Sequence, residues 1–205
     1  MLLMDESFGA IAPLTRAALQ NERTAENGIE WVGPASFGDQ YGVARADGAS
    51  GPAGVVDSLD ELSDFVHEHP DEATCCGDAE FMDRQWEAFQ DYYDARFNAA
   101  DVYRMSLASN YVNVAKADPC NFAEVFTTDA RLKSMDLQVD EDTDVYSTTQ
   151  LAAITVHHET AEAHPELGEA LDEETVISLN GMVDIDGLSA DEAALYFLRQ
   201  EGFIG

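Results

Sequence analysis

The sequence predicts an α/β protein in which short strands alternate with helices, and three observations support this fold class. Apolar residues recur at helical spacing, for example Leu59, Leu62 and Phe65. Short runs rich in β-branched and aromatic residues, such as residues 29–32, lie between the helical patterns. Hydrophobic residues make up 45% and charged residues 25% of the 205 positions, which is typical of a globular chain with its own core. This alternation predicts helices packed on mostly parallel sheets.

The first quarter of the chain predicts one helix and two strands. The helix covers residues 5–26 and ends where an Asn-Gly pair follows, since glycine favours a helix terminus. Strands are expected at residues 29–32 and 41–44. The glycine-rich stretch 47–54 is typical of a linker.

From Ser58 onward the pattern alternates more regularly. Ser58 and Glu61 predict a capping box at the start of a helix that ends before Pro70. The next expected elements are a strand at 73–77, helices at 83–97 and 105–115, and strands at 122–126, 135–139 and 151–156. Further helices are expected at 159–170, at 173–179 and after Ser189, which again has a glutamate three residues later.

The charge balance excludes several classes of partner. The chain has 41 acidic and 10 basic side chains, a formal net charge of -31, and only two lysines, Lys116 and Lys133. Such a surface repels nucleic acid and anionic lipid, so neither is expected as a partner. Two interpretations remain: an acidic patch for a cationic partner, or a surface adapted to molar salt. The acids are spread from Asp5 to Glu201, which favours the second.

The three cysteines, Cys75, Cys76 and Cys120, are predicted to be buried thiols in strands. A disulfide between the adjacent Cys75 and Cys76 would be strained, and the spacing fits no zinc motif. The apolar residues 1–4 are followed at once by Asp5 and Glu6, unlike a signal peptide. No stretch approaches the ~20 apolar residues of a membrane helix. We therefore expect no export signal or anchor in this chain.

Motifs typical of enzymes are absent from the sequence. There is no glycine-rich phosphate loop and no G-x-S-x-G elbow. The histidine cluster of His157, His158 and His164 lacks the i, i+4 spacing that places two imidazoles on one helix face. We therefore expect no catalysis, no metal ion and no cofactor. A metal-dependent hydrolase that uses this cluster is the alternative, and an acidic protein-interaction module is another.

Five short motifs occur in an order that is characteristic of one family. They are Trp31-Val32-Gly33-Pro34, Asp39-Gln40-Tyr41, Glu80-Phe81-Met82-Asp83-Arg84, residues 126–132 (Phe-Thr-Thr-Asp-Ala-Arg-Leu) and residues 179–184 (Leu-Asn-Gly-Met-Val-Asp). The chain thereby resembles the substrate-binding proteins of osmoprotectant ABC transporters, which take up glycine betaine, carnitine or choline.

The resemblance implies a two-lobe clamshell of the type II periplasmic-binding-protein fold, which closes on its ligand by hinge motion. Lobe two would span residues 45–147, and lobe one would comprise residues 1–44 and 148–205. Lobe one is expected to be incomplete, because a further N-terminal section of the family has no counterpart in this sequence. The implied function is non-catalytic capture of a quaternary amine outside the cytoplasm, at the membrane, for delivery to the transporter's membrane subunits. A truncated relative that binds nothing is the nearest rival.

The same resemblance implies five ligand-binding residues. Tyr41 and Phe126 would be walls of an aromatic cage, since a quaternary ammonium group has no N–H and is held by cation–π contacts. Asp39 would offer an oxygen to the cation, and Arg84 would bind the ligand carboxylate. Gln150 stands where the family has a cage tyrosine, so the cage is expected to be partial.

Overall fold

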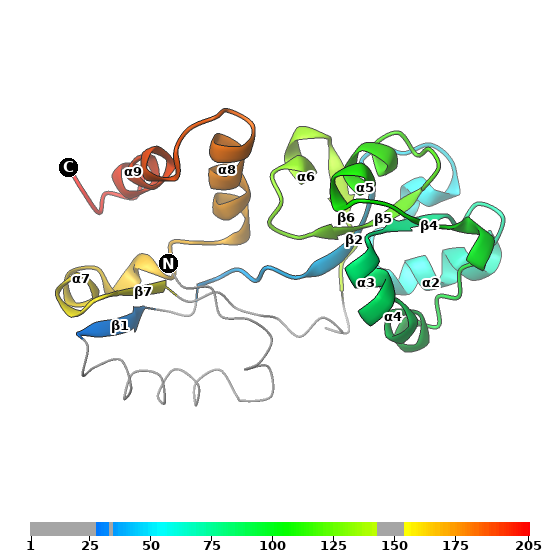
Figure 1. The fold of residues 1–205 in the computed structure, drawn as a ribbon, viewed down its shortest axis with the longest axis horizontal. Helices are drawn as coiled ribbons and strands as arrows, with labels where there is room; N and C mark the ends of the chain where they lie inside the picture. Colours follow the sequence, from blue (N-terminus) through cyan, green and yellow to red (C-terminus); the bar gives the residue numbers. More distant parts are fainter. Residues whose placement is uncertain (1–27, 33–34, 143–153) are drawn as a thin grey trace. The chain divides into compact units, whose positions relative to one another are not determined.

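The computed structural model describes residues 28–32, 35–142 and 154–205 (Figure 1). The chain divides into two compact units: unit 1 is Met1–Asp39 with Thr148–Gly205, and unit 2 is Gln40–Ser147. The predicted helix over residues 5–26 and the position of Gln150 lie outside the described residues.

Unit 2 is built on a five-stranded sheet with the order β4-β3-β5-β2-β6. The strands are β2 (Tyr41–Ala46), β3 (Cys75–Gly77), β4 (Val102–Arg104), β5 (Phe122–Phe126) and β6 (Leu137–Val139). β3 is parallel to β4 and β5, whereas β2 is antiparallel to both β5 and β6. Four of the five strands therefore run in the same direction, as predicted for a mostly parallel sheet, and β2 alone runs opposite to them. Alternating helices and strands predict parallel neighbours, but β2 lies between two strands that are far from it in sequence.

Helices cover both faces of this sheet. α2 (Leu59–Glu68), α3 (Ala79–Arg84) and α4 (Trp86–Tyr93) lie on one side in Figure 1, and α5 (Leu107–Val114) lies on the other. The remaining short helices are η2 (Pro52–Val55), η3 (Ala99–Asp101) and α6 (Arg131–Ser134).

One predicted helix is divided into two. The region expected to be a single helix over 83–97 contains α3 and α4, which meet at Gln85. The side chain of Asp78 caps α3 by accepting a hydrogen bond from Phe81 N at 2.8 Å, so the first helix begins earlier than its apolar pattern suggested. Asp94 then ends α4 in a left-handed conformation with φ 54°.

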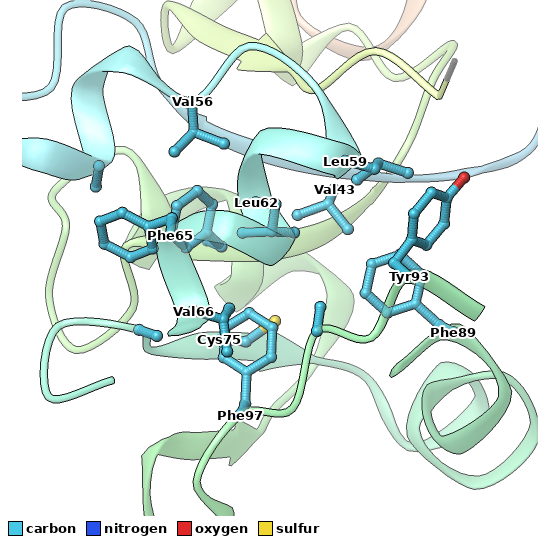
Figure 2. Close-up of a cluster of buried hydrophobic side chains, with 14 residues drawn as sticks. Val43, Val56, Leu59, Leu62, Phe65, Val66, Cys75, Phe89, Tyr93 and Phe97 are labelled. Carbon is cyan, nitrogen blue, oxygen red and sulfur yellow. The ribbon is translucent and has the colours of Figure 1, made fainter. Parts of the chain in front are cut away.

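The core of unit 2 has one apolar layer on each side of the sheet. Strand alternation directs Cys75 and Phe122 into a large cluster with α2 and α4 (Figure 2) and directs Cys76 and Ala123 to a smaller cluster with Val114 of α5. The labelled members of the large cluster are Val43, Val56, Leu59, Leu62, Phe65, Val66, Cys75, Phe89, Tyr93 and Phe97. Leu59, Leu62, Phe65 and Val66 are the buried face predicted for α2.

Cys76 and Cys120 form a disulfide, with their Cα atoms 5.7 Å apart. The prediction of buried thiols is therefore wrong for these two residues and confirmed for Cys75, which is buried and unpaired. The sequence excluded only the pair of adjacent cysteines. Cys120 reaches Cys76 because it precedes β5, the parallel neighbour of β3.

Unit 1 contains an antiparallel pair of strands, β1 (Ile29–Val32) and β7 (Ile154–His157). Its helices are α7 (His158–Ala163), η4 (Pro165–Leu167), α8 (Glu173–Asp184) and α9 (Ala190–Gln200). Ser189 and Glu192 form the predicted capping box at α9. At α2 only half of the box is present: Ser58 Oγ accepts from Glu61 N, but the Glu61 carboxylate accepts from Asp57 N. Across the described residues, no helix is both long enough and apolar enough to span a membrane.

Candidate ligand site

Three aromatic rings meet where β2 begins and β5 ends. Tyr41 is the first residue of β2 and pairs in register with Phe126, the last residue of β5. The centroids of their rings are 4.9 Å apart, and the Tyr41 ring lies 5.3 Å from that of Phe81 on α3. Tyr41 and Phe126 are half-buried, whereas Phe81 is buried. The sequence thus named two rings of this cluster and did not name Phe81, although Phe81 belongs to one of the five motifs.

The motif that follows Phe126 holds the end of β5 in place. The backbone N–H of Phe126 donates to the hydroxyl of Tyr111 on α5 at 2.9 Å. The guanidinium of Arg131 lies 4.0 Å from the centroid of the Tyr111 ring, a cation–π contact. Arg131 also forms two side-chain hydrogen bonds to Asp129, and its backbone N–H donates to the same carboxylate. The Thr-Thr-Asp-Ala-Arg segment therefore fixes the position of the Phe126 backbone.

Titration of these groups follows from their surroundings. Burial alone would raise the pKa of Asp129, but hydrogen bonds and the charge of Arg131 hold that pKa below its usual value. Burial raises the pKa of the Tyr111 phenol. At neutral pH the Asp129–Arg131 pair is therefore charged and Tyr111 is neutral.

Arg84 lies one helical turn after Phe81 on α3. Its guanidinium is exposed and forms an i, i+4 ion pair with Glu80, with Nη1 2.8 Å from Oε1. Exposed pairs of this kind are worth at most about 1 kcal/mol, so another carboxylate can take the place of Glu80 at small cost. The structure thus puts Arg84 on the helix that supplies the third ring, and its role in ligand binding stays a prediction.

Asp39 and Gln150 are not part of the described cluster. Asp39 is exposed and is the last residue of the first segment of unit 1, two positions before Tyr41. Gln150 lies outside the described residues. Their roles in binding also stay predictions.

One member of the histidine cluster in unit 1, His158, forms ion pairs with two glutamates. His158 Nδ1 is 2.6 Å from Glu30 Oε1, and His158 Nε2 is 3.3 Å from Glu162 Oε1. The hydrogen bond and charge of Glu30 raise the pKa of His158. Within residues 28–32, 35–142 and 154–205, no three or more His, Cys, Asp or Glu side chains are grouped as a metal site requires.

A cavity of about 360 Å³ lies in unit 1, and the residues that line it do not include Asp39, Tyr41, Arg84 or Phe126. Its lining comes from α7, η4, α9 and the C-terminal segment and consists of Glu159, Thr160, Ala163, His164, Leu167, Leu198, Phe203 and Ile204. Because a quaternary amine requires aromatic faces, and Phe203 is the only one of these residues with a benzene ring, the ring cluster of unit 2 suits such a ligand better.

Comparison with known proteins shows which family this chain resembles. Residues 3–200 match the substrate binding domain of ABC-type glycine betaine transport systems. A glycine-betaine-binding protein of Pseudomonas aeruginosa is 26% identical over 96% of this chain, which spans 66% of that protein. An ergothioneine transport permease/ergothioneine binding protein, EgtU, of Helicobacter pylori is 26% identical over 86% of this chain, which spans 32% of that protein.

Two solved structures share the fold. Apo YehZ from Escherichia coli superposes with a TM-score of 0.73 at 19% identity, covering 98% of this chain and 75% of YehZ. A structure described as a glycine betaine/carnitine/choline ABC transporter superposes with a TM-score of 0.74 at 18% identity. The match covers 98% of this chain and 74% of the chain in that structure. Because the family match extends over residues 3–200, the chain belongs to the substrate-binding domains of ABC-type glycine betaine transport systems.

Proposed function

We propose that this protein captures a quaternary-amine compatible solute, glycine betaine or a close analogue, for uptake by an ABC transporter. The observation that carries the proposal is the cluster of Tyr41, Phe81 and Phe126, whose members come from three of the five motifs. Aromatic faces bind a trimethylammonium group through cation–π contacts of roughly 0.5–2 kcal/mol each. Tyr41 and Phe126 are half-buried, so their rings keep surface for such a group.

In this proposal units 1 and 2 are the two lobes of a clamshell binding protein. Arg84 exchanges Glu80 for the carboxylate of the ligand, and Asp39 and Gln150 contribute as the family resemblance implies. The partners are the small-molecule amine and the membrane subunits of the transporter. The function is binding and transport rather than catalysis.

The proposed location is outside the cytoplasm, beside the transporter. The Cys76–Cys120 disulfide supports this location, because disulfides persist in oxidising compartments and are rare in the cytosol.

Calorimetric titration with glycine betaine, choline and ergothioneine tests the proposal. Ergothioneine is included because the Helicobacter relative is named for it and it also carries a trimethylammonium group. We expect Tyr41→Ala and Arg84→Ala each to weaken binding about tenfold or more, which corresponds to about 1.4 kcal/mol. Matched controls are Tyr92→Ala, an exposed tyrosine of α4, and Arg96→Ala, an exposed arginine paired with Asp91. Unchanged affinity in both site variants would refute the site, and binding of none of the three amines would favour the truncated, non-binding rival.

We further propose that the acid-rich surface is an adaptation to high salt. The Debye length is about 30 Å at 0.01 M salt and about 3 Å at 1 M, so molar salt removes most of the repulsion among the acids. Since this repulsion is stronger in the compact state, we expect circular dichroism to show partial unfolding at low KCl and recovery at molar KCl. Equal folding and heat stability at about 0.01 M and 2 M KCl would instead favour a cationic partner for the acidic surface.

A further inference from the structure

A fully buried carboxylate lies in the sheet of unit 2, on the strand that ends in Phe126. Glu124 of β5 is 0% exposed. Its Oε2 atom accepts hydrogen bonds from Asp78 N at 3.1 Å and from Asn110 Nδ2 at 2.8 Å. Its Oε1 atom is buried without a hydrogen-bond partner. A buried glutamate in the middle of a strand is costly, so it calls for a functional explanation.

Strand register places Glu124 one step inward from the aromatic pair. Tyr41 pairs with Phe126, and Val43 pairs with Glu124. Because side chains alternate along a strand, the Cβ atoms of all four residues lie on the same face of the sheet. The Cα atoms of diagonal neighbours in an antiparallel pair of strands are about 7–8 Å apart, and Tyr41 and Glu124 are such neighbours. Asp78, which donates to Glu124, also caps the helix that carries Phe81.

The environment of Glu124 allows both of its charge states near neutral pH. Burial raises the pKa of Glu124 to about 7, although the hydrogen bonds from Asp78 N and Asn110 oppose this shift. The groups around it are the carboxylate of Asp78 at α3, the buried Cys75 thiol of β3 and the neutral amide of Asn110 on α5. Asp78 raises the pKa further, and no cation neutralises Glu124 among these neighbours.

We propose that Glu124 is the charge-selecting residue of the ligand site, whose ionised carboxylate attracts the trimethylammonium head held by Tyr41 and Phe126. This inference rests on the proposed function. A carboxylate and an ammonium group about 7–8 Å apart inside a protein, where the effective dielectric constant is about 20, attract each other by more than thermal energy. Protonation removes it. Glu124 therefore favours cations over uncharged molecules of the same shape, and it links ligand affinity to pH.

Linkage gives this role a signature that a structural role would lack. If ionised Glu124 strengthens cation binding about tenfold, the bound cation must lower the pKa of Glu124 by about one unit. Cation binding at pH 7 then releases protons. An uncharged ligand of equal shape releases none through Glu124.

The test compares choline with 3,3-dimethylbutan-1-ol, its uncharged carbon analogue, by calorimetry at pH 6 and pH 8.5 in two buffers of different ionisation enthalpy. For the wild type we expect choline to bind about fivefold more tightly at pH 8.5 than at pH 6, with proton release at pH 7, and the analogue to show neither effect. Glu124→Gln should abolish the pH dependence and the proton release. Glu68→Gln, which removes an exposed charge at the end of α2, should retain both.

Circular dichroism shows whether the Glu124→Gln variant is folded. Difference infrared spectroscopy of the wild type provides a second measurement that needs no variant. Loss of a protonated-carboxyl band when choline is added at pH 7 supports the inference, and no change in that band contradicts it. If the wild type binds no amine at any pH, the proposed function fails and this inference fails with it. If wild type and Glu124→Gln bind choline with the same pH dependence, only the role of Glu124 is refuted.

Discussion

The two units differ in how many apolar side chains they bury among the described residues. Unit 2 packs apolar layers against both faces of a five-stranded sheet, and several of its largest side chains are completely inaccessible, among them Tyr111, Phe122 and Leu62. In the described part of unit 1 the buried apolar residues are Ala35, Ala161, Ala193 and Phe197, and α8 has no buried residue. The predicted ligand residues within the described elements, Tyr41, Arg84 and Phe126, all belong to unit 2.

This difference indicates which unit can hold a ligand-binding geometry on its own. A ring positioned for cation–π contact must be held by packed neighbours and hydrogen bonds. Phe126 meets this requirement through Tyr111, and Tyr41 through its pairing with Phe126. Unit 1 offers fewer such constraints among its described residues, so unit 2 should account for most of the measurable stability.

The largest expected difference between the units is in the free energy of unfolding that each loses when one of its phenylalanines is replaced by alanine. Phe122 is 0% exposed and lies in the large cluster, so Phe122→Ala should lower the free energy of unfolding by about 3–5 kcal/mol. Phe197→Ala on α9 should cost less, because much of its helix is exposed. Urea denaturation followed by circular dichroism measures both. Equal losses would show that the two units are equally well packed.

Reduction of the disulfide should have the next largest effect. The bond closes a loop with a sequence separation of 44 and limits the unfolded state of unit 2, so reduction should cost about 2–4 kcal/mol. Thermal unfolding with and without a phosphine reductant measures this effect. A Cys76→Ser/Cys120→Ser variant should match the reduced protein and be insensitive to the reductant. A reductant effect that persists in this variant would have to come from elsewhere.

A smaller effect is expected from a buried acid in unit 2. Burial raises the pKa of Asp140 to about 8, with Arg45 opposing the shift and Asp57 and Glu61 adding to it. Because the folded pKa exceeds the ordinary value, this carboxyl favours folding at low pH, and that contribution is lost as pH rises from about 4 to 8. Between pH 5 and pH 8 the free energy of unfolding should therefore fall in both proteins, and the fall should be about 1–2 kcal/mol smaller in Asp140→Asn than in the wild type.

The matched control lies in unit 1. The pKa of His158 is also raised, by Glu30, but this side chain is exposed and solvent screens the pair. His158→Asn should leave the pH dependence of unfolding unchanged, as measured by urea titrations across the same range. A larger change in His158→Asn than in Asp140→Asn would reverse the comparison between the two units.

Local signals were sufficient for most elements of the fold. Strands at residues 29–32, 122–126 and the start of 41–46 follow from short apolar runs, and the start of α9 follows from its capping residues. β4 was missed, because it has only three residues and none of them is buried, which is too short a pattern to indicate a strand. The division between α3 and α4 was also missed, since the apolar spacing continues across Gln85.

The sequence by itself determined the α/β class, the family motifs, the acidic surface and two rings of the aromatic cluster. Only the tertiary structure decided the antiparallel insertion of β2, the Cys76–Cys120 bond, the contact of Phe81 with Tyr41 and the burial of Glu124. The physical reason is the range of the interactions. Helix periodicity and capping join residues a few positions apart, whereas strand order brings together residues that are far apart in the chain.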